Sequence, residues 1–258
     1  MAKLQFLLLV LATHLWVSTA AGRPRQIHPL RRLEAAGDHS DHGISCDSWR
    51  MAVETNNIRR WKTVPAACEF YLGNYMLGGL YRKDSAFAID QAVEYAESLK
   101  IAGDGKDVWV FDIDETSLSN LPYYSIHGFG SEPYNDTLYS QWVEMEMAFA
   151  LPETLRLYNR LLSLGIRVVF LTGRKEHQRH HTAMNLIKAG YTSWEKLLLR
   201  RPSDGSTTAL VFKSGQRKKL EEEGYRIVGN IGDEWSDILG GSAGSRTFKL
   251  PDPLYYIS

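Results

Sequence analysis

Two carboxylates stand two positions apart, at Asp112 and Asp114, directly after a run of apolar residues. In an extended chain such side chains point to the same face, so the pair can act at one place. With Glu115, three acidic groups crowd four positions, and their repulsion beside a buried strand is costly unless a cation neutralises them. A hard divalent ion with oxygen ligands, most simply Mg²⁺, is the natural counter-charge.

Acidic residues also follow an apolar run near the end of the chain. Residues 227–231 lead into Asp233, Glu234 and Asp237. A single Asp-x-Asp pair is a weak signal, because acidic turns are usually solvated and calcium loops share the spacing. Independent surface turns would rarely place acids after two separate buried runs. The sequence therefore favours one metal site that both acidic segments share.

Two further apolar runs end in groups that suit an oxyanion. Residues 168–171 are followed by Thr172 and Gly173, a hydroxyl and a flexible turn whose backbone N–H groups can bind an oxyanion at a helix start. Residues 209–212, which we expect to form a strand, are followed by Lys213. Of the four apolar runs, two end in acids, one ends in a hydroxyl and one ends in a lysine. Together these groups predict a site for a metal ion and a phosphate group.

Two neighbouring clusters fit this site less well. Lys218 and Lys219 lie further along the helix that begins after Lys213, and a run of acids behind them indicates a solvated face. His177 and His181 are four positions apart and share a helix face, but no third metal ligand accompanies them. We therefore prefer Lys213 as the phosphate-binding cation and interpret the histidines as part of a basic helix.

The elements that must position these groups follow from periodicity. Beyond residue 105, short apolar runs alternate with helical stretches, which predicts an α/β fold with a Rossmann-like, open, mostly parallel sheet and helices on both faces. Ligands of such folds bind at the carboxyl ends of the strands. The expected strands are 108–113, 167–172, 196–199, 209–212, 226–231 and 246–250, and the expected helices are 84–101, 152–164, 176–189 and 214–223.

Residues 117–151 do not fit the alternation. The middle of this segment is irregular and rich in Tyr, Trp, Phe and Met, which predicts a small lid over the strand ends. Its aromatic rings either stack on a substrate and exclude water or pack the lid onto the core, and the sequence leaves both interpretations open. These aromatic residues are Tyr123, Tyr124, Tyr134, Tyr139 and Trp142.

Composition indicates one secreted domain. The chain has 258 residues, and its 30 basic and 30 acidic side chains cancel, so bulk charge gives no reason to expect a nucleic-acid partner. Residues 1–21 have the layout of a secretory signal peptide, with an apolar run shorter than the roughly 20 residues of a membrane span. We predict that residues 22–45 form a mobile leader and that residues 46–258 form the folded domain. We expect a secreted or vacuolar protein with no membrane partner.

The only two cysteines, Cys46 and Cys68, would then lie in an oxidising compartment. A disulfide between them would stabilise the fold by roughly 3 kcal/mol. Two unpaired thiols are the alternative, and zinc is disfavoured because no further ligands stand at metal spacing. The one Asn-x-Ser/Thr sequon, at Asn135, predicts an exposed loop, and its glycosylation stays open.

Four segments carry a resemblance to a known family: 112–116, 171–174, 212–214 and 232–237. In this order they are similar to the four motifs of the haloacid dehalogenase (HAD) superfamily of phosphohydrolases. Residues 53–57, 61–63 and 213–217 resemble the plant acid phosphatase and vegetative storage protein family, which is akin to bacterial class B acid phosphatases. The resemblance extends over about 46–258 and implies a HAD-like fold.

The resemblance also implies a reaction. Asp112 would be the nucleophile that forms an aspartyl-phosphate. Asp114 would serve as acid and then base, a role that needs a pKa near the working pH. Thr172, Gly173 and Lys213 would bind phosphoryl oxygens and stabilise the charge that develops on them.

By the same resemblance, the Asp112 carboxylate, the Asp114 carbonyl and the Asp233 carboxylate would hold Mg²⁺, with Asp237 in support. The implied protein is a Mg²⁺-dependent acid phosphatase of small phosphomonoesters. A nitrogen-storage protein is the alternative, although the presence of Asp112 favours an enzyme. Carbon–halogen hydrolysis is disfavoured, because dehalogenases lack the second aspartate. The physiological substrate and homo-oligomer formation stay open.

Overall fold

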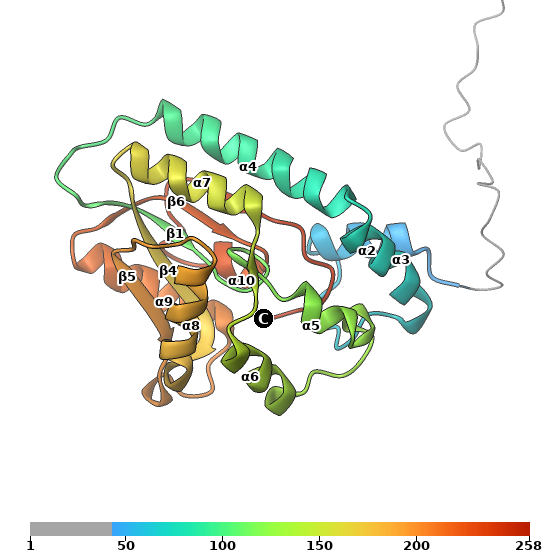
Figure 1. Cartoon of the computed structure of the whole chain (residues 1–258). Helices are drawn as coiled ribbons and strands as arrows, with labels where there is room; N and C mark the ends of the chain where they lie inside the picture. Colours follow the sequence, from blue (N-terminus) through green and yellow to red (C-terminus); the bar gives the residue numbers. More distant parts are fainter. Residues whose placement is uncertain (1–42) are drawn as a thin grey trace, which may run out of the picture. The chain divides into compact units, whose positions relative to one another are not determined.

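The computed structural model describes residues 43–258 (Figure 1). The predicted signal peptide and residues 22–42 of the predicted leader lie outside the described residues. A sheet of five parallel strands runs through the domain in the order β5-β4-β1-β6-β7. The strands are β1 Asp107–Phe111, β4 Arg167–Lys175, β5 Lys196–Arg200, β6 Arg226–Gly232 and β7 Thr247–Lys249. The predicted open, parallel α/β sheet is thereby confirmed.

Helices cover both faces of the sheet. They are α4 Leu80–Ser98, α7 Pro152–Ser163, α8 Arg179–Lys188, α9 Ala209–Glu222 and the short α10 Trp235–Ile238. Successive side chains of a strand point to opposite faces. Trp109 and Phe111 therefore pack in the core cluster with α4, α7 and α8, whereas Val108 and Val110 pack against α9 on the other side.

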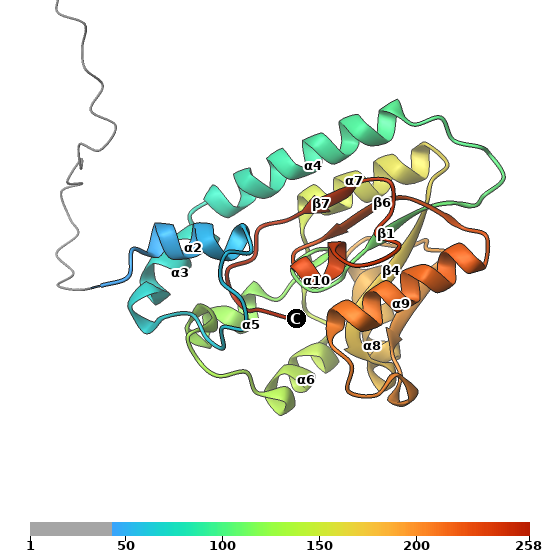
Figure 2. The ribbon, with the colours of Figure 1, turned by 180° about the vertical axis from the view of Figure 1, so that it is seen from behind.

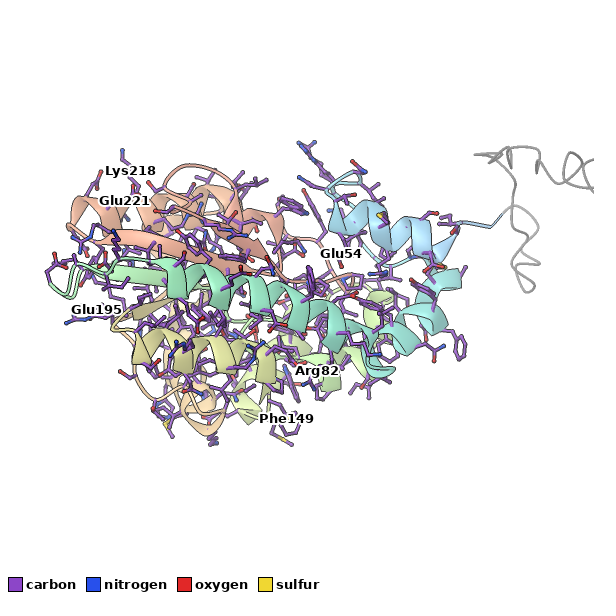
Figure 3. The ribbon with its side chains drawn as sticks, turned by 90° about the horizontal axis from the view of Figure 1, so that it is seen from above. Glu54, Arg82, Phe149, Glu195, Lys218 and Glu221 are labelled. Atoms are coloured by element: carbon purple, nitrogen blue, oxygen red, sulfur yellow. A yellow bond between two sulfur atoms is a disulfide. The ribbon has the colours of Figure 1, made fainter. Side chains whose placement is uncertain are left out.

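Helices α4 and α7 lie side by side on one face of the sheet (Figure 1). Polar contacts tie them together along their outer edge. The guanidinium of Arg82 on α4, labelled in Figure 3, pairs with the carboxylate of Glu153 on α7 at 2.5 Å. Since both helices pack their apolar faces on β1 and β4, they hold the strands that carry the predicted site.

One predicted strand is wrong. Residues 209–212 form the start of α9, because the hydroxyl of Thr208 accepts a hydrogen bond from the Val211 N–H at 3.3 Å and caps the helix. A run of four apolar residues fits a buried strand and a helix turn equally well, and here the cap decides. Lys213 therefore projects from within α9 and does not follow a strand.

The segment between β1 and α7 forms a small helical insertion. Its elements are β2 Leu118–Ser119, α5 Leu121–Ser125, the 3₁₀ turn η2 Gly128–Gly130, α6 Asp136–Met145 and β3 Phe149–Ala150. Strands β2 and β3 pair antiparallel, with Leu118 opposite Ala150, and so hold the two ends of the insertion together. Asn135 caps α6, since its side-chain oxygen accepts from the N–H groups of Thr137 and Leu138.

The N-terminal part of the described chain packs as a separate layer of helices. Its elements are α2 Cys46–Glu54, the 3₁₀ turn η1 Ala66–Cys68 and α3 Glu69–Leu77. A disulfide joins Cys46 to Cys68, with 5.5 Å between their Cα atoms, which confirms the pairing favoured from the sequence. It closes a loop whose Trp61 packs edge-on against Trp49.

Two more 3₁₀ turns, η3 Glu176–Gln178 and η4 Pro202–Asp204, follow β4 and β5. After β7 the chain runs back across the molecule, and Leu254 packs among tyrosines of α3, α4 and α5. Within residues 43–258, no helix has the length and apolar character that crossing a membrane requires. The last residues end near the carboxyl edge of the sheet (Figure 2).

Candidate active site

The two acidic segments meet at the carboxyl edge of the sheet. Strand β1 lies between β4 and β6, so the residues that follow β1 and β6 are neighbours. The N–H of Asp112 donates to the carbonyl of Ile231 at 3.0 Å and extends the strand ladder one residue beyond β1. The main chain thereby fixes Asp112 beside Asp233.

Three buried carboxylates form one cluster at this edge. Oxygen atoms of Asp112, Asp233 and Asp237 all lie within 4.8 Å of one another. The hydroxyl of Thr116 donates to Asp233 Oδ1 at 2.7 Å, and the Glu234 N–H donates to Asp237 Oδ2 at 2.9 Å. These bonds fix the orientation of the Asp233 and Asp237 carboxylates within the cluster.

Lys213 supplies a buried positive charge to this cluster. Its Nζ lies 2.5 Å from Asp112 Oδ1 and also donates to Asp237 Oδ1. Burial alone would lower the pKa of the Lys213 ammonium, but the two carboxylates beside it raise that pKa above its ordinary value. The lysine therefore carries its charge at every physiological pH.

The donor set suits a hard divalent cation. Burial raises the pKa of the Asp112 carboxyl well above its usual range, although Lys213 opposes this shift, and burial likewise raises the pKa of Asp233. Three carboxylates against one ammonium leave an excess of negative charge in a place that water solvates poorly. A divalent cation bound by these oxygens would compensate that charge and favour the ionised carboxylates.

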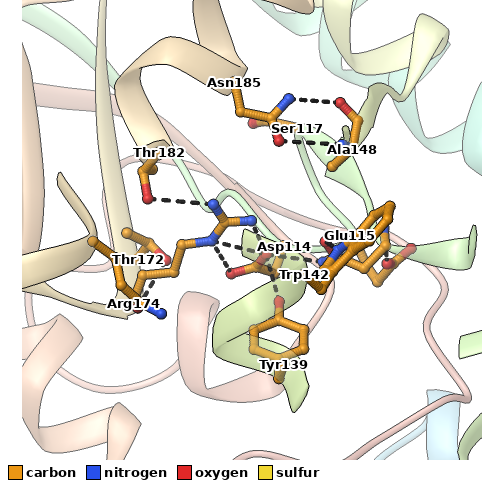
Figure 4. A network of polar contacts seen from close by, with 12 residues as sticks. Asp114, Glu115, Ser117, Tyr139, Trp142, Ala148, Thr172, Arg174, Thr182 and Asn185 are labelled. Carbon is orange, nitrogen blue, oxygen red and sulfur yellow. Dashed lines mark hydrogen bonds and ion pairs between the residues drawn. The ribbon is translucent and has the colours of Figure 1, made fainter. Parts of the chain in front are cut away.

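The Asp114 side chain lies outside this cluster and is held by a network of its own (Figure 4). Two guanidinium nitrogens of Arg174 bind this carboxylate. Nη2 lies 2.7 Å from Oδ1, and Nε lies 3.1 Å from each carboxylate oxygen. The hydroxyl of Tyr139 donates to Oδ1 at 2.8 Å, and the Asn120 amide donates at 2.9 Å. Three donors thus converge on Oδ1, whereas within residues 43–258 Oδ2 accepts only from Arg174 Nε.

This network sets the charge of Asp114. Burial alone would raise the pKa of the carboxyl, but the charge and hydrogen bonds of Arg174, with Asn120 and Tyr139, lower it below its usual value. The group is therefore ionised in the absence of substrate. The expectation of a pKa near the working pH does not describe the protein in this state.

The backbone of Asp114, unlike its side chain, faces the three-carboxylate cluster. The hydroxyl of Tyr255 lies 2.9 Å from Asp233 Oδ2 and 3.3 Å from the Asp114 carbonyl oxygen. One hydroxyl thus touches two oxygen atoms that the sequence predicted as metal ligands. The ring of Tyr255 stacks on Tyr124 of α5, with 5.5 Å between centroids, which fixes its position.

The predicted phosphate-binding residues divide into two groups. Gly173 and Lys213 line a cavity of about 750 Å³ that also exposes Asp112 and Asp114. Gly173 is exposed, and a Cβ at its position would meet no atom within 4 Å, so a ligand can approach its backbone closely. Thr172 is fully buried and does not line the cavity, and its hydroxyl accepts a hydrogen bond from the Arg174 N–H at 3.1 Å.

The sequence did not predict several residues of this site. Tyr255 belongs to a C-terminal segment that carries no recognisable local motif. Asn120 and Thr116 have ordinary polar side chains, and only their contacts reveal a role. The predicted turn at 172–174 is wrong, because β4 continues to Lys175. Arg174 lies in this segment, its side chain is buried on Asp114, and no local signal indicates this partner.

The clusters judged less suitable from the sequence lie apart from the cavity wall. Lys218 is exposed on the outer side of α9 and pairs with Glu222 at 3.7 Å (Figure 3). His181 pairs with Glu146 of the insertion at 2.8 Å. Within the part of the chain that the structure describes, no histidine belongs to a group of side chains close enough to hold a metal ion.

Comparisons with known proteins agree in one family. A family model described as HAD superfamily, subfamily IIIB (Acid phosphatase), matches residues 31–258. The chain is 50% identical over 214 residues to "Acid phosphatase 1" of Solanum lycopersicum, an alignment that covers 83% of this chain and 84% of the relative. It is also 50% identical over 231 residues to "Stem 28 kDa glycoprotein" of Glycine max, with 89% and 90% covered.

A further relative carries a different kind of name. The chain is 39% identical over 266 residues to "Vegetative storage protein 1" of Arabidopsis thaliana, with 99% of this chain and 98% of the relative covered. Among solved structures, the class C acid phosphatase from Bacillus anthracis is similar, with a TM-score of 0.61, 21% identity, and 74% and 87% of the two chains covered. At that identity the likeness concerns the fold alone.

Proposed function

Because the chain belongs to the acid phosphatases of HAD subfamily IIIB, it is a phosphomonoester hydrolase, and we propose that Asp112 is its nucleophile. The Asp112 carboxylate attacks phosphorus, the ester P–O bond breaks, and the substrate alcohol leaves with a proton from Asp114. Water activated by ionised Asp114 then attacks the aspartyl-phosphate, which returns Asp112 as a carboxylate and releases inorganic phosphate. The proposed substrates are small phosphomonoesters.

Two groups of this chain balance the charge of the phosphoryl group in this proposal. Lys213 lies against Asp112 and can move its ammonium to a phosphoryl oxygen when the ester binds. Gly173 offers its N–H near the end of β4, where the pairing with β5 is irregular between Leu171 and Lys175. We assign Thr172 to support of this end of the strand through the Arg174 N–H, because its hydroxyl does not line the cavity.

We propose Mg²⁺ as the cofactor, held by the carboxylates of Asp112, Asp233 and Asp237 and by the Asp114 carbonyl. The buried excess of carboxylates and the hard oxygen donors support this choice. When bound, Mg²⁺ offsets the repulsion between the Asp112 carboxylate and the phosphate. The Asp114 side chain remains outside this ligand set and stays available for proton transfer.

The observation that carries the proposal is the contact of Asp112 with Lys213 beside Asp233 and Asp237, in a chain of this family. Asp112→Asn should retain less than about 1% of the kcat for an aryl phosphate, because the amide is a poor nucleophile. Circular dichroism should report an intact fold. Asp104→Asn, on a surface turn before β1, is the matched control and should keep full activity.

Removal of divalent ions tests the cofactor separately. EDTA should stop turnover of the unaltered protein, and added Mg²⁺ should restore it. Full activity in the chelator would contradict the metal proposal while leaving the nucleophile untouched. Activity retained by Asp112→Asn would instead remove Asp112 from its role.

The storage relative motivates a second candidate function, accumulation as a nitrogen reserve. The phosphatase activity of the purified protein per milligram decides between the two functions, because a reserve protein needs no catalytically competent Asp112. We also propose a secreted or vacuolar location and glycosylation at exposed Asn135, in keeping with relatives named as stem glycoproteins. Mass spectrometry of the native protein tests both the processed N-terminus and the glycan.

A further inference from the structure

The cavity has a buried inner end and a wider outer part. The inner end holds Asp112, Asp233, Asp237 and Lys213, which are almost fully buried. Exposed or half-exposed residues from several separate segments form the outer part. A volume of about 750 Å³ is far more than a phosphoryl group alone requires, so the outer part accommodates the leaving group of the substrate.

Positive charge predominates in this outer part. It contains Arg60, Lys62, Lys175 and Arg200, and the Asp136 side chain is paired with Lys175 at 2.7 Å. The carboxyl oxygen of Ser258, which also lines the cavity, accepts from the Ala209 N–H at 2.7 Å. Within residues 43–258, the other three cations have no carboxylate within 4.0 Å. The outer part therefore attracts negative charge independently of the phosphate-binding groups.

Arg200 is held in place even without a carboxylate. Its Nη1 donates to the carbonyl of Thr207 at 2.6 Å, and its guanidinium lies over the ring of Phe212, 4.7 Å from the centroid. The Ser258 backbone oxygen nearby is already bound by the Ala209 N–H at 2.7 Å. Within residues 43–258, no residue other than Thr207 accepts a hydrogen bond from Arg200, so its Nε and Nη2 groups are available to an anionic ligand.

Aromatic side chains line the same outer part of the cavity. Trp61 stands between Arg60 and Lys62 in the chain and packs near Tyr256, with 6.3 Å between ring centroids. Tyr134 lines the wall formed by the insertion. Such rings favour a flat, apolar group by stacking, while exposed cations add electrostatic attraction.

From this arrangement we infer that the outer cavity selects phosphomonoesters whose leaving group is aromatic and carries a second negative charge. The inference rests on the proposed function, since the phosphate must occupy the inner end. The ring would lie against Trp61 and Tyr256. The second anion would meet Arg60, Lys62 and Arg200.

Calorimetric titration with non-hydrolysable phosphonates tests the inference without any turnover. The full mature protein with Mg²⁺ is titrated with methylphosphonate, phenylphosphonate and 4-carboxyphenylphosphonate. We expect phenylphosphonate to bind more tightly than methylphosphonate, and the carboxylated ring to bind roughly five- to tenfold more tightly than phenylphosphonate. Added salt should reduce the second difference, because these cations are exposed.

The variant Arg60→Gln/Lys62→Gln should lose most of the preference for the carboxylated ring and keep the affinity for phenylphosphonate. Arg59→Gln is the matched control, since Arg59 is exposed next to Arg60 but does not line the cavity. Equal affinities of the unaltered protein for phenylphosphonate and 4-carboxyphenylphosphonate would overturn the inference. So would a loss of the preference in Arg59→Gln as large as that in Arg60→Gln/Lys62→Gln. A failed nucleophile assignment would leave these binding data unchanged, so the two failures are distinguishable.

Discussion

Asp114 illustrates how neighbouring groups set the chemistry of a single residue. In the proposed reaction, the first step requires the neutral form of Asp114 and the second requires its carboxylate. Arg174, Tyr139 and Asn120 stabilise the carboxylate, so the structure is arranged for the second step. The first step needs Asp114 to gain a proton, which Arg174 opposes.

Arg174→Gln should therefore change the pH profile. Without the guanidinium, burial predominates and raises the pKa of Asp114, so the acid form persists to higher pH. The alkaline limb of kcat/KM, which reports the essential acid of the free enzyme, should move to higher pH. Rate profiles with an aryl phosphate measure this shift, and Arg179→Gln, at an exposed arginine paired with Glu176, is the control.

An alkaline limb that stays in place or moves to lower pH would contradict this account of Asp114. The maximal value of kcat/KM does not test this account, because Arg174 also lines the cavity and its removal can change substrate binding.

Tyr255 is a positioning residue for the proposed metal site. Its hydroxyl contacts Asp233 Oδ2 and the Asp114 carbonyl, so it orients oxygens from two distant segments. Tyr255→Phe should weaken Mg²⁺ binding by roughly tenfold, the usual effect of removing a group that orients metal ligands. Calorimetric titration of the metal-free protein with Mg²⁺ measures it. Tyr256→Phe should bind Mg²⁺ normally, and unchanged or tighter binding by Tyr255→Phe would refute the assignment.

At the scale of elements, α9 explains why one lysine belongs to the site and another does not. The Thr208 cap fixes where the helix begins, and this start places Lys213 toward the carboxylates. Five positions later the helix has turned, so Lys218 faces solvent. The helix thus selects between two chemically identical side chains.

Lys213→Met should lower kcat by roughly 10² to 10³, as expected when a group that stabilises the transition-state charge is removed. Lys218→Met should keep the unaltered kcat. Steady-state kinetics measure both, and circular dichroism verifies that each variant folds. Equal effects in the two variants would show that the helix geometry does not distinguish the lysines.

At the scale of the whole molecule, the disulfide connects stability to the cavity. The loop between Cys46 and Cys68 carries Arg60, Trp61 and Lys62, which line the outer cavity. Closing this loop restricts the unfolded chain and holds the loop against α2 and α3.

Cys46→Ala/Cys68→Ala should lower the free energy of unfolding by roughly 3 kcal/mol. Its kcat for a small phosphate ester should change little, because the catalytic carboxylates lie on the sheet and not on this loop. Urea unfolding with and without a thiol reductant measures the effect. The unaltered protein should become less stable in reductant while the variant does not respond, and two identical responses would contradict the prediction.

The sequence alone was sufficient for the five strands of the parallel sheet, although it added a wrong one at 209–212, and for the acids that follow two of them at Asp112, Asp233 and Asp237. Buried strands need continuous apolar runs, and charged residues directly after them stand out against that background. The helix boundaries could be placed within a few residues because proline, glycine and capping residues are local signals. The resemblance of four short segments to a family then indicated the reaction.

Only the tertiary structure decided which side chains share the site. Residues 209–212 could not be assigned to a helix from four apolar residues, since the Thr208 cap is what settles it. The partnership of Arg174 with Asp114, and the contact of Tyr255 with both acidic segments, join residues far apart in the chain. Such contacts depend on packing over long sequence separations, which no local pattern records, and they determine the charge of Asp114 and the wall of the cavity.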